Sequence, residues 1–338
     1  DRPAPQGGPR FKWFDVNKGR LPNHGEVKDP QRIAKAASLV QFAEASHFHA
    51  VTEVLARFWL LQHQGVFQDP EVALIARPDR RKEEGFLSPL LHMLVPDLLK
   101  QNRVSWWPSD GIIEPDVRLH VSRLFYADWR PPAAFGKDGG HCSTPRSVLL
   151  PAHKLLRDAL AALPSPANAQ AGAEKPTTQA LIFVLRRNQE MRSRLAREEE
   201  LKRELRVIAE AADPALSFEA FDGSPSAAAT AALFSRARAV VGVHGGALAN
   251  ILFCSRGADL FEMGFATPFA GHYRHLAAAV GVRATLLPLA ADHRGIGAMD
   301  VALADFDAAV ATLRAALLSS SNVPASFAAQ AHGSMDEL

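Results

Sequence analysis

The sequence predicts an α/β protein with parallel sheets that carry helices on both faces, a doubly wound arrangement. Three observations lead to this prediction. Short continuous apolar runs, such as residues 72–76 and 180–185, are typical of buried strands. Periodic segments of helical length separate these runs. In the second half of the chain the two kinds of segment alternate regularly, which is the pattern of a parallel sheet.

The first half is expected to begin with an extended arm over residues 1–30, which are rich in proline, glycine and charge. The periodic stretch 31–64 predicts two helices, or one helix broken near residues 46–49. Pro96 should kink or end a helix predicted over residues 85–99, because proline has no backbone N–H. The remaining predicted elements are strands at 72–76, 103–107 and 120–126, a loop at 130–147 and a helix at 152–163.

A run of small residues and prolines at 164–176 predicts a linker or exposed loop. The elements beyond it are predicted to be strands at 180–185, 217–221, 239–243, 259–263 and 284–289, and helices at 197–212, 227–236, 246–253, 273–280 and 305–318. Asp305 is expected to cap the last helix. A chain of 338 residues suits two domains, which we place at residues 1–165 and 177–320.

The composition restricts the class of protein. Apolar residues make up 47% of the chain, so it can build a core and is not disordered overall. The formal net charge is only +2, which gives no electrostatic reason to expect binding to nucleic acid or to an anionic membrane. No apolar run approaches the ~18 residues that span a bilayer. Cys142 and Cys254 are too few for a cysteine-based metal site; we expect buried free thiols, or a pair if the chain is luminal.

The ends of the chain bear on its location. The sequence begins at Asp1 without an initiator methionine or a signal-peptide pattern, which indicates a mature or trimmed chain. It ends in Met335-Asp336-Glu337-Leu338, which resembles the Lys-Asp-Glu-Leu class of retrieval signals. We therefore expect the protein in the lumen of the endoplasmic reticulum or the Golgi.

The stretch 240–250, with the sequence VVGVHGGALAN, is the strongest candidate for a binding site. A predicted strand ends at His244, Gly245 and Gly246 follow, and a helix-forming sequence comes next. Open α/β sheets bind ligands at the carboxyl ends of their strands. Glycines let the backbone approach a phosphate, and a helix N-terminus offers unpaired N–H groups. The alternative is a tight strand-to-helix turn with a structural histidine.

Two further predicted strands end in side chains suited to a nucleotide. One is followed by Arg186 and Arg187, with Arg194 farther along, and guanidinium groups bind phosphate oxygens in a bidentate way. The other ends in Glu262, where a carboxylate can accept hydrogen bonds from ribose hydroxyls. Each charge alone is compatible with a solvated surface residue, but the three strand ends together predict a nucleotide site.

The second half resembles glycosyltransferase family 61, a GT-B type family that includes plant xylosyl- and arabinosyltransferases and animal O-linked N-acetylglucosamine transferases. The strongest motif of the family is Gly-x-His-Gly-Ala-Gly-Leu-x-Asn-x-x-Phe, followed by a strand ending in Glu. The matching residues here are Gly242, His244, Gly245, Leu248, Asn250, Phe253 and Glu262. An upstream pattern is matched by Arg186 or Arg187, and by Arg194, Glu198, Glu200 and Leu201.

The first half is similar to the family over a shorter stretch. The family pattern Asn-x-x-His-x-x-x-Glu has a counterpart in residues 46–53, in which His49 and Glu53 match. Residues four apart share one face of a helix. Histidine titrates near neutral pH, so His49 is our candidate for the catalytic base, and Glu53 either orients it or is itself the base. The alternative for His49 is a buried structural histidine.

The resemblance implies a GT-B-like fold, in which two Rossmann-like domains face a cleft with the acceptor side in the first and the donor in the second. It implies transfer of a sugar, with inversion, from a nucleotide sugar to a hydroxyl of a glycan or glycoprotein. We expect a uridine diphosphate sugar as donor. We expect no cofactor and no metal, because arginines and helix termini can neutralise a diphosphate. The predicted donor contacts are Arg186, Arg187, Arg194, His244, Gly245, Gly246 and Glu262.

Two other interpretations stay open. The sequence departs from the family pattern at Ser46, Arg197, Ala229-Thr230 and Gly246-Ala247. These departures fit a catalytically inactive relative that serves as a structural or binding subunit. Another nucleotide-binding α/β protein, such as a dehydrogenase, is a third interpretation, but no Gly-x-Gly-x-x-Gly follows an early strand.

Overall fold

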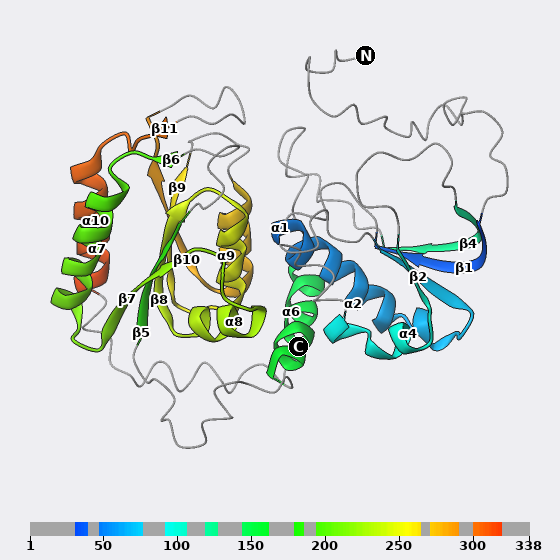
Figure 1. Cartoon of the computed structure of the whole chain (residues 1–338). Helices are drawn as coiled ribbons and strands as arrows, with labels where there is room; N and C mark the ends of the chain where they lie inside the picture. Colours follow the sequence, from blue (N-terminus) through cyan, green and yellow to red (C-terminus); the bar gives the residue numbers. More distant parts are fainter. Residues whose placement is uncertain are drawn as a thin grey trace, which may run out of the picture.

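The computed structural model describes residues 31–39, 47–76, 92–106, 119–127, 144–161, 179–185, 194–264, 271–290 and 300–319. Two sheets, each built of parallel strands, lie side by side with helices between them (Figure 1). This arrangement confirms the predicted α/β, GT-B-like fold class. The predicted arm at 1–30, the linker at 164–176, Cys142 and the last four residues lie outside the described parts of the chain.

The first sheet has four parallel strands in the order β3-β2-β1-β4. The strands are β1 (Gln31–Ser38), β2 (Val72–Ala76), β3 (Val104–Trp106) and β4 (Leu119–Tyr126). The prediction of helix over residues 31–38 is wrong, whereas the other three strands agree with prediction. β1 lies between β2 and β4, and pairing with two neighbours outweighs a local preference that is weak by itself.

One helical stretch of the first half runs from His47 to His63. It consists of α1 (His47–His49), the π-helical turn η1 (Ala50–Val54) and α2 (Leu55–His63). The break predicted near residues 46–49 therefore coincides with the start of this stretch. It is followed by the short 3₁₀ helix η2 (Val66–Gln68).

Two prolines mark the remaining helices of the first half. Pro96 is the first residue of α4 (Pro96–Lys100), so it separates this helix from the turn before it, as predicted. α6 (Arg146–Ala161) begins earlier than the predicted 152, and Pro151 lies inside it. Pro151 is the sixth residue of α6, so its missing N–H leaves the carbonyl of residue 147 without its helical hydrogen bond.

The second sheet has five parallel strands in the order β10-β9-β8-β5-β7. The strands are β5 (Gln179–Val184), β7 (Leu216–Phe221), β8 (Ala237–Val243), β9 (Asp259–Gly264) and β10 (Arg283–Pro288). A separate two-stranded sheet pairs β6 (Arg194–Leu195) with β11 (Asp300–Val301). The five predicted strands of this half are all present.

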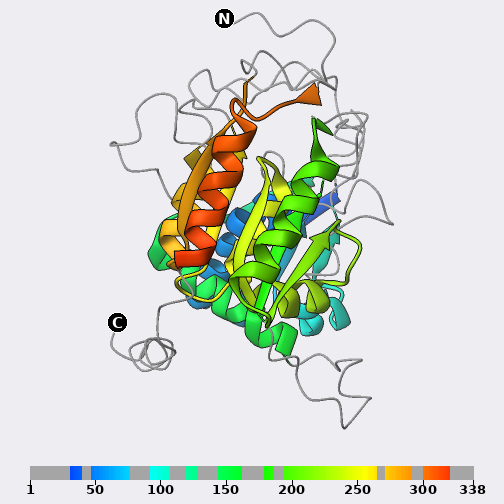
Figure 2. The ribbon, with the colours of Figure 1, turned by 90° about the vertical axis from the view of Figure 1, so that its left-hand side faces the viewer.

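Helices cover both faces of the second sheet (Figures 1 and 2). The face turned toward the first half carries α8 (Ala227–Ser235), η5 (Gly246–Phe253) and α9 (His272–Val280). The outer face carries α7 (Glu198–Ala212) and α10 (Phe306–Ser319). The helix expected at residues 246–253 is a 3₁₀ helix. Asp305 caps α10 as predicted, because its carboxylate accepts a hydrogen bond of 2.9 Å from the N–H of Ala308.

Alternation along the strands divides the apolar side chains of the second sheet into two layers. In β5, Ala180, Ile182 and Val184 belong to the layer between the sheets, whereas Leu181 and Phe183 belong to the layer under α7 and α10. The inner layer is continuous with the core of the first half. The second sheet is therefore buried on both faces.

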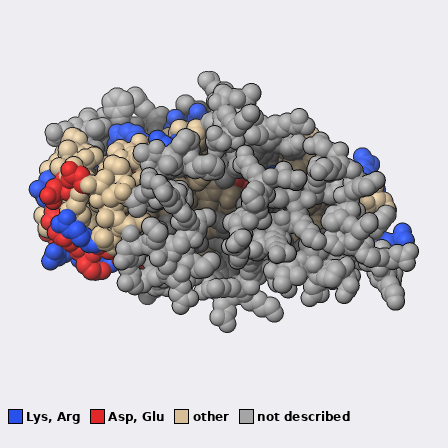
Figure 3. Space-filling model, turned by 90° about the horizontal axis from the view of Figure 1, so that it is seen from above, with Lys and Arg blue, Asp and Glu red and all other residues tan. Residues whose placement is uncertain are grey.

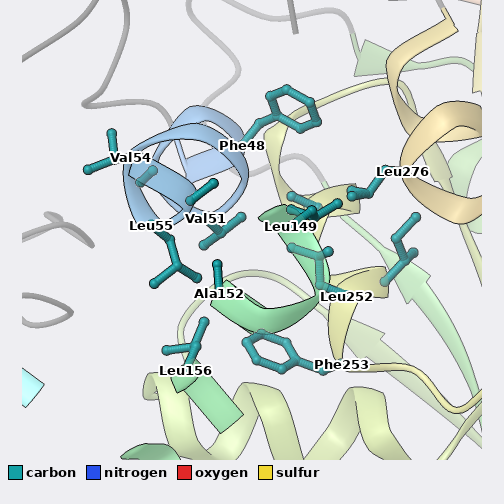
Figure 4. Close-up of a cluster of buried hydrophobic side chains, with 14 of the residues drawn as sticks. Phe48, Val51, Val54, Leu55, Leu149, Ala152, Leu156, Leu252, Phe253 and Leu276 are labelled. Atoms are coloured by element: carbon teal, nitrogen blue, oxygen red, sulfur yellow. The ribbon is translucent and has the colours of Figure 1, made fainter. Parts of the chain in front are cut away.

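The layer between the sheets joins the two halves of the chain. Figure 4 shows Phe48, Val51 and Leu55 of the first helical stretch close to Leu149 of α6 and Leu252 of η5. All of these side chains are almost completely buried. Because they come from both halves, burial of this layer stabilises the two sheets as one packed unit.

The surface over α7 and α10 carries charges of both signs. In the view of Figure 3, basic and acidic side chains lie together at the end of the molecule formed by the outer helices of the second sheet. The Nη2 atom of Arg314 in α10 lies 3.2 Å from Oε2 of Glu204 in α7. Within α7, Nζ of Lys202 lies 3.0 Å from Oε1 of Glu198. No helix in the described part of the chain has the length and apolarity needed to cross a bilayer.

Candidate functional site

The order of strands in the second sheet reverses between β5 and β8. After β5 the chain continues to β7 on one side, whereas β8, β9 and β10 extend the sheet on the other side. Ligands of open α/β sheets bind at such a reversal, beyond the carboxyl ends of the two strands. His244 directly follows β8, and residues 186 and 187 follow β5 in the chain. The topology therefore places the predicted motif at the expected ligand position.

His244 and Glu262 form a pair beside this reversal. Gly242 of β8 is in register with Glu262 of β9, and alternation turns residues 242, 244 and 262 toward the first half of the chain. The Nδ1 atom of His244 lies 2.5 Å from the Oε1 atom of Glu262. The carboxylate is fully buried, whereas the histidine side chain is 28% exposed. The buried end of the pair thus anchors an imidazole whose other end is accessible.

The structure corrects one detail of the prediction for Glu262. β9 continues to Gly264, so this carboxylate is not at the end of its strand. Its side chain is completely buried and contacts His244. Glu262 is therefore part of the packed interior as well as a candidate for ligand binding. The Oε2 atom has no hydrogen-bond partner among the described residues. One buried acceptor therefore remains next to His244.

The turn after His244 leads directly into η5. The backbone N–H of His244 donates to the carbonyl of Met263 at 2.8 Å, which ties the end of β8 to β9. Gly245 precedes η5 with φ 171° and ψ 162°, an extended conformation that any residue can adopt. The backbone angles at Gly245 therefore do not require glycine. Gly246 is the first residue of η5, where helical N–H groups lack partners within the helix.

His49 and Glu53 form a second histidine–carboxylate pair, in the first half of the chain. The Nδ1 atom of His49 lies 2.9 Å from the Oε1 atom of Glu53, as the spacing of four residues predicted. Their side chains are 19% and 10% exposed. A carboxylate accepts the proton of Nδ1, which leaves Nε2 of the imidazole as the nitrogen that can take up a proton.

His272 connects the two pairs and was not among the predicted site residues. Its ring centroid lies 5.1 Å from that of His244 and 5.5 Å from that of Phe48, the neighbour of His49 in sequence. Burial lowers the pKa of His272 to about 4, and the nearby imidazoles of His244 and His49 add to this effect. His272 is the first residue of α9, and its place just beyond strand β9 is the signal that could have identified it.

For three of the predicted donor contacts the structure does not describe the side chain. Arg186 and Arg187 lie outside the described residues. Arg194 belongs to β6, but its side chain is not described. Their roles in phosphate binding stay predictions.

The described residues hold no group of three His, Cys, Asp or Glu side chains arranged to bind a metal ion. The chain contains one Asp-x-Asp sequence, Asp305-Phe306-Asp307. Asp305 caps α10, and Asp307 lies in its first turn. Cys254 is a buried free thiol, as expected.

Two sheets of parallel strands, with helices between them and a His-Gly-Gly turn at a strand-order reversal, match the class of GT-B-like α/β glycosyltransferases. A family model described as Glycosyltransferase 61 matches residues 47–261, which is more than half of the chain. The chain belongs to glycosyltransferase family 61. A search of curated proteins found no match to this sequence.

Proposed function

We propose that this protein transfers a sugar from a uridine diphosphate sugar to a hydroxyl group of a glycan or a glycoprotein, with inversion at the sugar carbon and without a metal ion. Membership of a glycosyltransferase family supports the transfer of a sugar between a donor and an acceptor. The identity of the donor and of the acceptor is our proposal. In it, residues 1–165 form the acceptor-side domain and residues 177–320 the donor-side domain.

The observation that carries the proposal is the position of the His-Gly-Gly turn at the reversal between β5 and β8. In the proposed complex the diphosphate lies at this turn, close to the start of η5. Free N–H groups at the start of a helix and arginine side chains both stabilise phosphate oxygens. We assign the arginine role to Arg186, Arg187 and Arg194, which neutralise the charge of the leaving diphosphate without a cation.

The acceptor side of the proposed reaction belongs to His49. Its Nε2 atom takes the proton of the acceptor hydroxyl, and the hydroxyl oxygen forms a bond to the anomeric carbon of the sugar. The bond from that carbon to the diphosphate oxygen breaks, and the electron pair leaves with the diphosphate. Glu53 holds Nδ1 of His49 at 2.9 Å and stabilises the imidazolium that forms. His244, held by Glu262, faces the diphosphate.

We also propose a location in the lumen of the endoplasmic reticulum or the Golgi. Family membership supports this location, because glycosyltransferases of this family usually act in the secretory pathway. The similarity of residues 335–338 to a retrieval signal is a second reason to test it.

A thermal-shift series with nucleotides tests the donor assignment. At 100 times its dissociation constant a ligand adds about 2.7 kcal/mol to the stability of the folded state. We expect uridine diphosphate to raise Tm more than guanosine or adenosine diphosphate, and His49→Ala to leave this shift unchanged. Release of uridine diphosphate from its sugars, with and without glycan acceptors, then identifies the sugar. If no nucleotide raises Tm, the protein is instead the catalytically inactive relative.

A further inference from the structure

Asn250 of the motif contacts both halves of the chain. The residue is only 3% exposed, so each polar group of its side chain needs a partner inside the protein. The Nδ2 atom donates to the carbonyl of Ala247 at 3.0 Å, within the first turn of η5. The Oδ1 atom lies 2.9 Å from Nε2 of His47, which is 203 residues away in the sequence.

These contacts determine the direction of both hydrogen bonds. The carbonyl of Ala247 only accepts, so the amino group of Asn250 must face it. The amide oxygen of Asn250 therefore faces His47, and Nε2 of His47 must carry the proton that it accepts. Burial lowers the pKa of His47, which favours the neutral ring with its proton on Nε2.

An aromatic contact next to this hydrogen bond holds the same two segments together. Phe48, which lies between His47 and His49, packs edge-on against Tyr273 with the ring centroids 5.2 Å apart. Tyr273 in turn packs edge-on against His244 at 5.0 Å. The backbone that carries His49 is thus fixed to the second half by two contacts, His47 with Asn250 and Phe48 with Tyr273.

We propose that Asn250 and His47 are a positioning pair that fixes the His-Gly-Gly turn relative to His49. This inference rests on the proposed function, because it assigns the donor to the turn and the base to His49. Asn250 touches the first turn of η5, and His47 is two residues from His49 on the same helical stretch. Loss of the pair displaces the base, and with it the acceptor hydroxyl, relative to the sugar held at the turn. Transfer is sensitive to displacements of about 1 Å.

The test compares Asn250→Ala, His47→Leu and the double variant with the wild type. We expect each single variant to bind uridine diphosphate within twofold of the wild type and to transfer sugar at least tenfold more slowly per bound nucleotide. The transfer rate of the double variant should equal that of the more impaired single variant. Both changes remove the same hydrogen bond, so their effects should not add. Each transfer rate is divided by the amount of nucleotide that the sample binds. Unfolded molecules bind no nucleotide and therefore do not affect this ratio.

Conservative and matched variants make the result specific. His47→Gln keeps an N–H donor near the position of Nε2 and should recover most of the rate lost in His47→Leu. His63→Gln, at the exposed end of the same helical stretch, should behave as the wild type. Histidine ¹⁵N spectra should show the Nε2–H form of His47 in the wild type. Uridine diphosphate should shift the signals of His49 in the wild type but not in Asn250→Ala.

The outcomes separate this inference from the proposed function. If the wild type binds no nucleotide, the proposed function fails and the positioning role fails with it. If the wild type transfers sugar and Asn250→Ala keeps its rate per bound nucleotide, only the positioning role is overturned. Losses of rate that multiply in the double variant also overturn it, because they show that the two side chains act independently.

Discussion

The Nδ1 atom of His244 lies 2.5 Å from the Oε1 atom of the fully buried Glu262, on the neighbouring strand of the second sheet. The carboxylate that holds His244, the histidine of the motif, is therefore inaccessible to solvent. The pair fixes the orientation of an imidazole at the reversal between β5 and β8, where the donor is proposed to bind. Its function can be tested by changing the carboxylate alone.

Glu262→Gln should weaken the binding of uridine diphosphate more than it weakens folding. The amide oxygen of glutamine can still accept from Nδ1 of His244, but it carries no charge. A charge-assisted hydrogen bond, worth about 1.5–3 kcal/mol, thus becomes a weaker neutral one, and His244 is held less firmly in its orientation. We expect a loss of affinity of about tenfold or more, measured by calorimetry. Glu210→Gln on the exposed side of α7 is the matched control. Loss of soluble protein with normal affinity in the remainder would show that Glu262 is only structural.

His49→Ala should leave donor binding nearly intact and reduce sugar transfer by about a hundredfold or more, the usual contribution of a positioned base. Glu53→Gln should cause a smaller loss, because the imidazole remains but its orientation and charge are less well supported. Turnover and donor affinity are measured for both variants. Unchanged turnover in His49→Ala would remove this residue from the mechanism and leave Glu53 or His244 as candidates.

His153 should make the folded state sensitive to moderate acid. Burial, with a smaller contribution from the charge of Arg157, lowers the pKa of His153 to about 3. In the unfolded chain the histidine titrates near 6.5. The unfolded state thus takes up a proton first, and stability present above about pH 6.5 is lost as the pH falls toward 3. Each such group contributes up to about 1.4 kcal/mol per pH unit.

The comparison of wild type with His153→Leu measures this contribution. Urea unfolding at pH 7.5 and pH 5.5 should show a smaller loss of stability in the variant, because leucine takes up no proton. His272, whose pKa is lowered to about 4, contributes in the same direction in both proteins. Identical pH dependence of the two proteins would contradict the assignment to His153.

Gly242→Ala should destabilise the second sheet. A Cβ atom at Gly242 would lie 2.9 Å from Cβ of Val184 and 3.0 Å from a methyl group of Leu248, closer than such atoms pack. Overpacking of this kind costs about 1–3 kcal/mol. Gly264→Ala is the milder comparison, since the nearest contact of its Cβ, with the end of the Leu286 side chain, is at 3.3 Å. An unfolding free energy of Gly242→Ala equal to that of the wild type would show that β5 and η5 can move apart at no cost.

Arg197→Asn should be more stable than Arg197→Ala. Arg197 precedes α7 with φ 60° and ψ 28°, in the left-handed region that asparagine adopts more easily than other residues. Both variants lose the contacts of the guanidinium with Glu200 and with the ring of Phe306. The difference in their free energies of unfolding therefore measures the cost of the left-handed backbone conformation at residue 197. We expect this difference to be roughly 1 kcal/mol. Equal stability in urea unfolding would contradict this account.

The sequence alone determined much of the second half. Its strands are continuous apolar runs separated by helices of regular length, and such local periodicity survives in any arrangement of the sheet. The spacing of His49 and Glu53 predicted their contact because a helix places residues four apart on one face. The His-Gly-Gly turn was identifiable because it follows a strand directly.

Only the tertiary structure decided which distant residues meet. Residues 31–38 became strand β1 because β2 and β4 pair with both of its edges, which no local pattern reveals. Glu262 meets His244 because β8 and β9 are neighbours in register, and His47 meets Asn250 across 203 residues. His272 joins the site through the packing of α9 against α1 and η5. Contacts of this kind depend on strand order and helix packing, which are set by burial of the shared core rather than by neighbours in sequence.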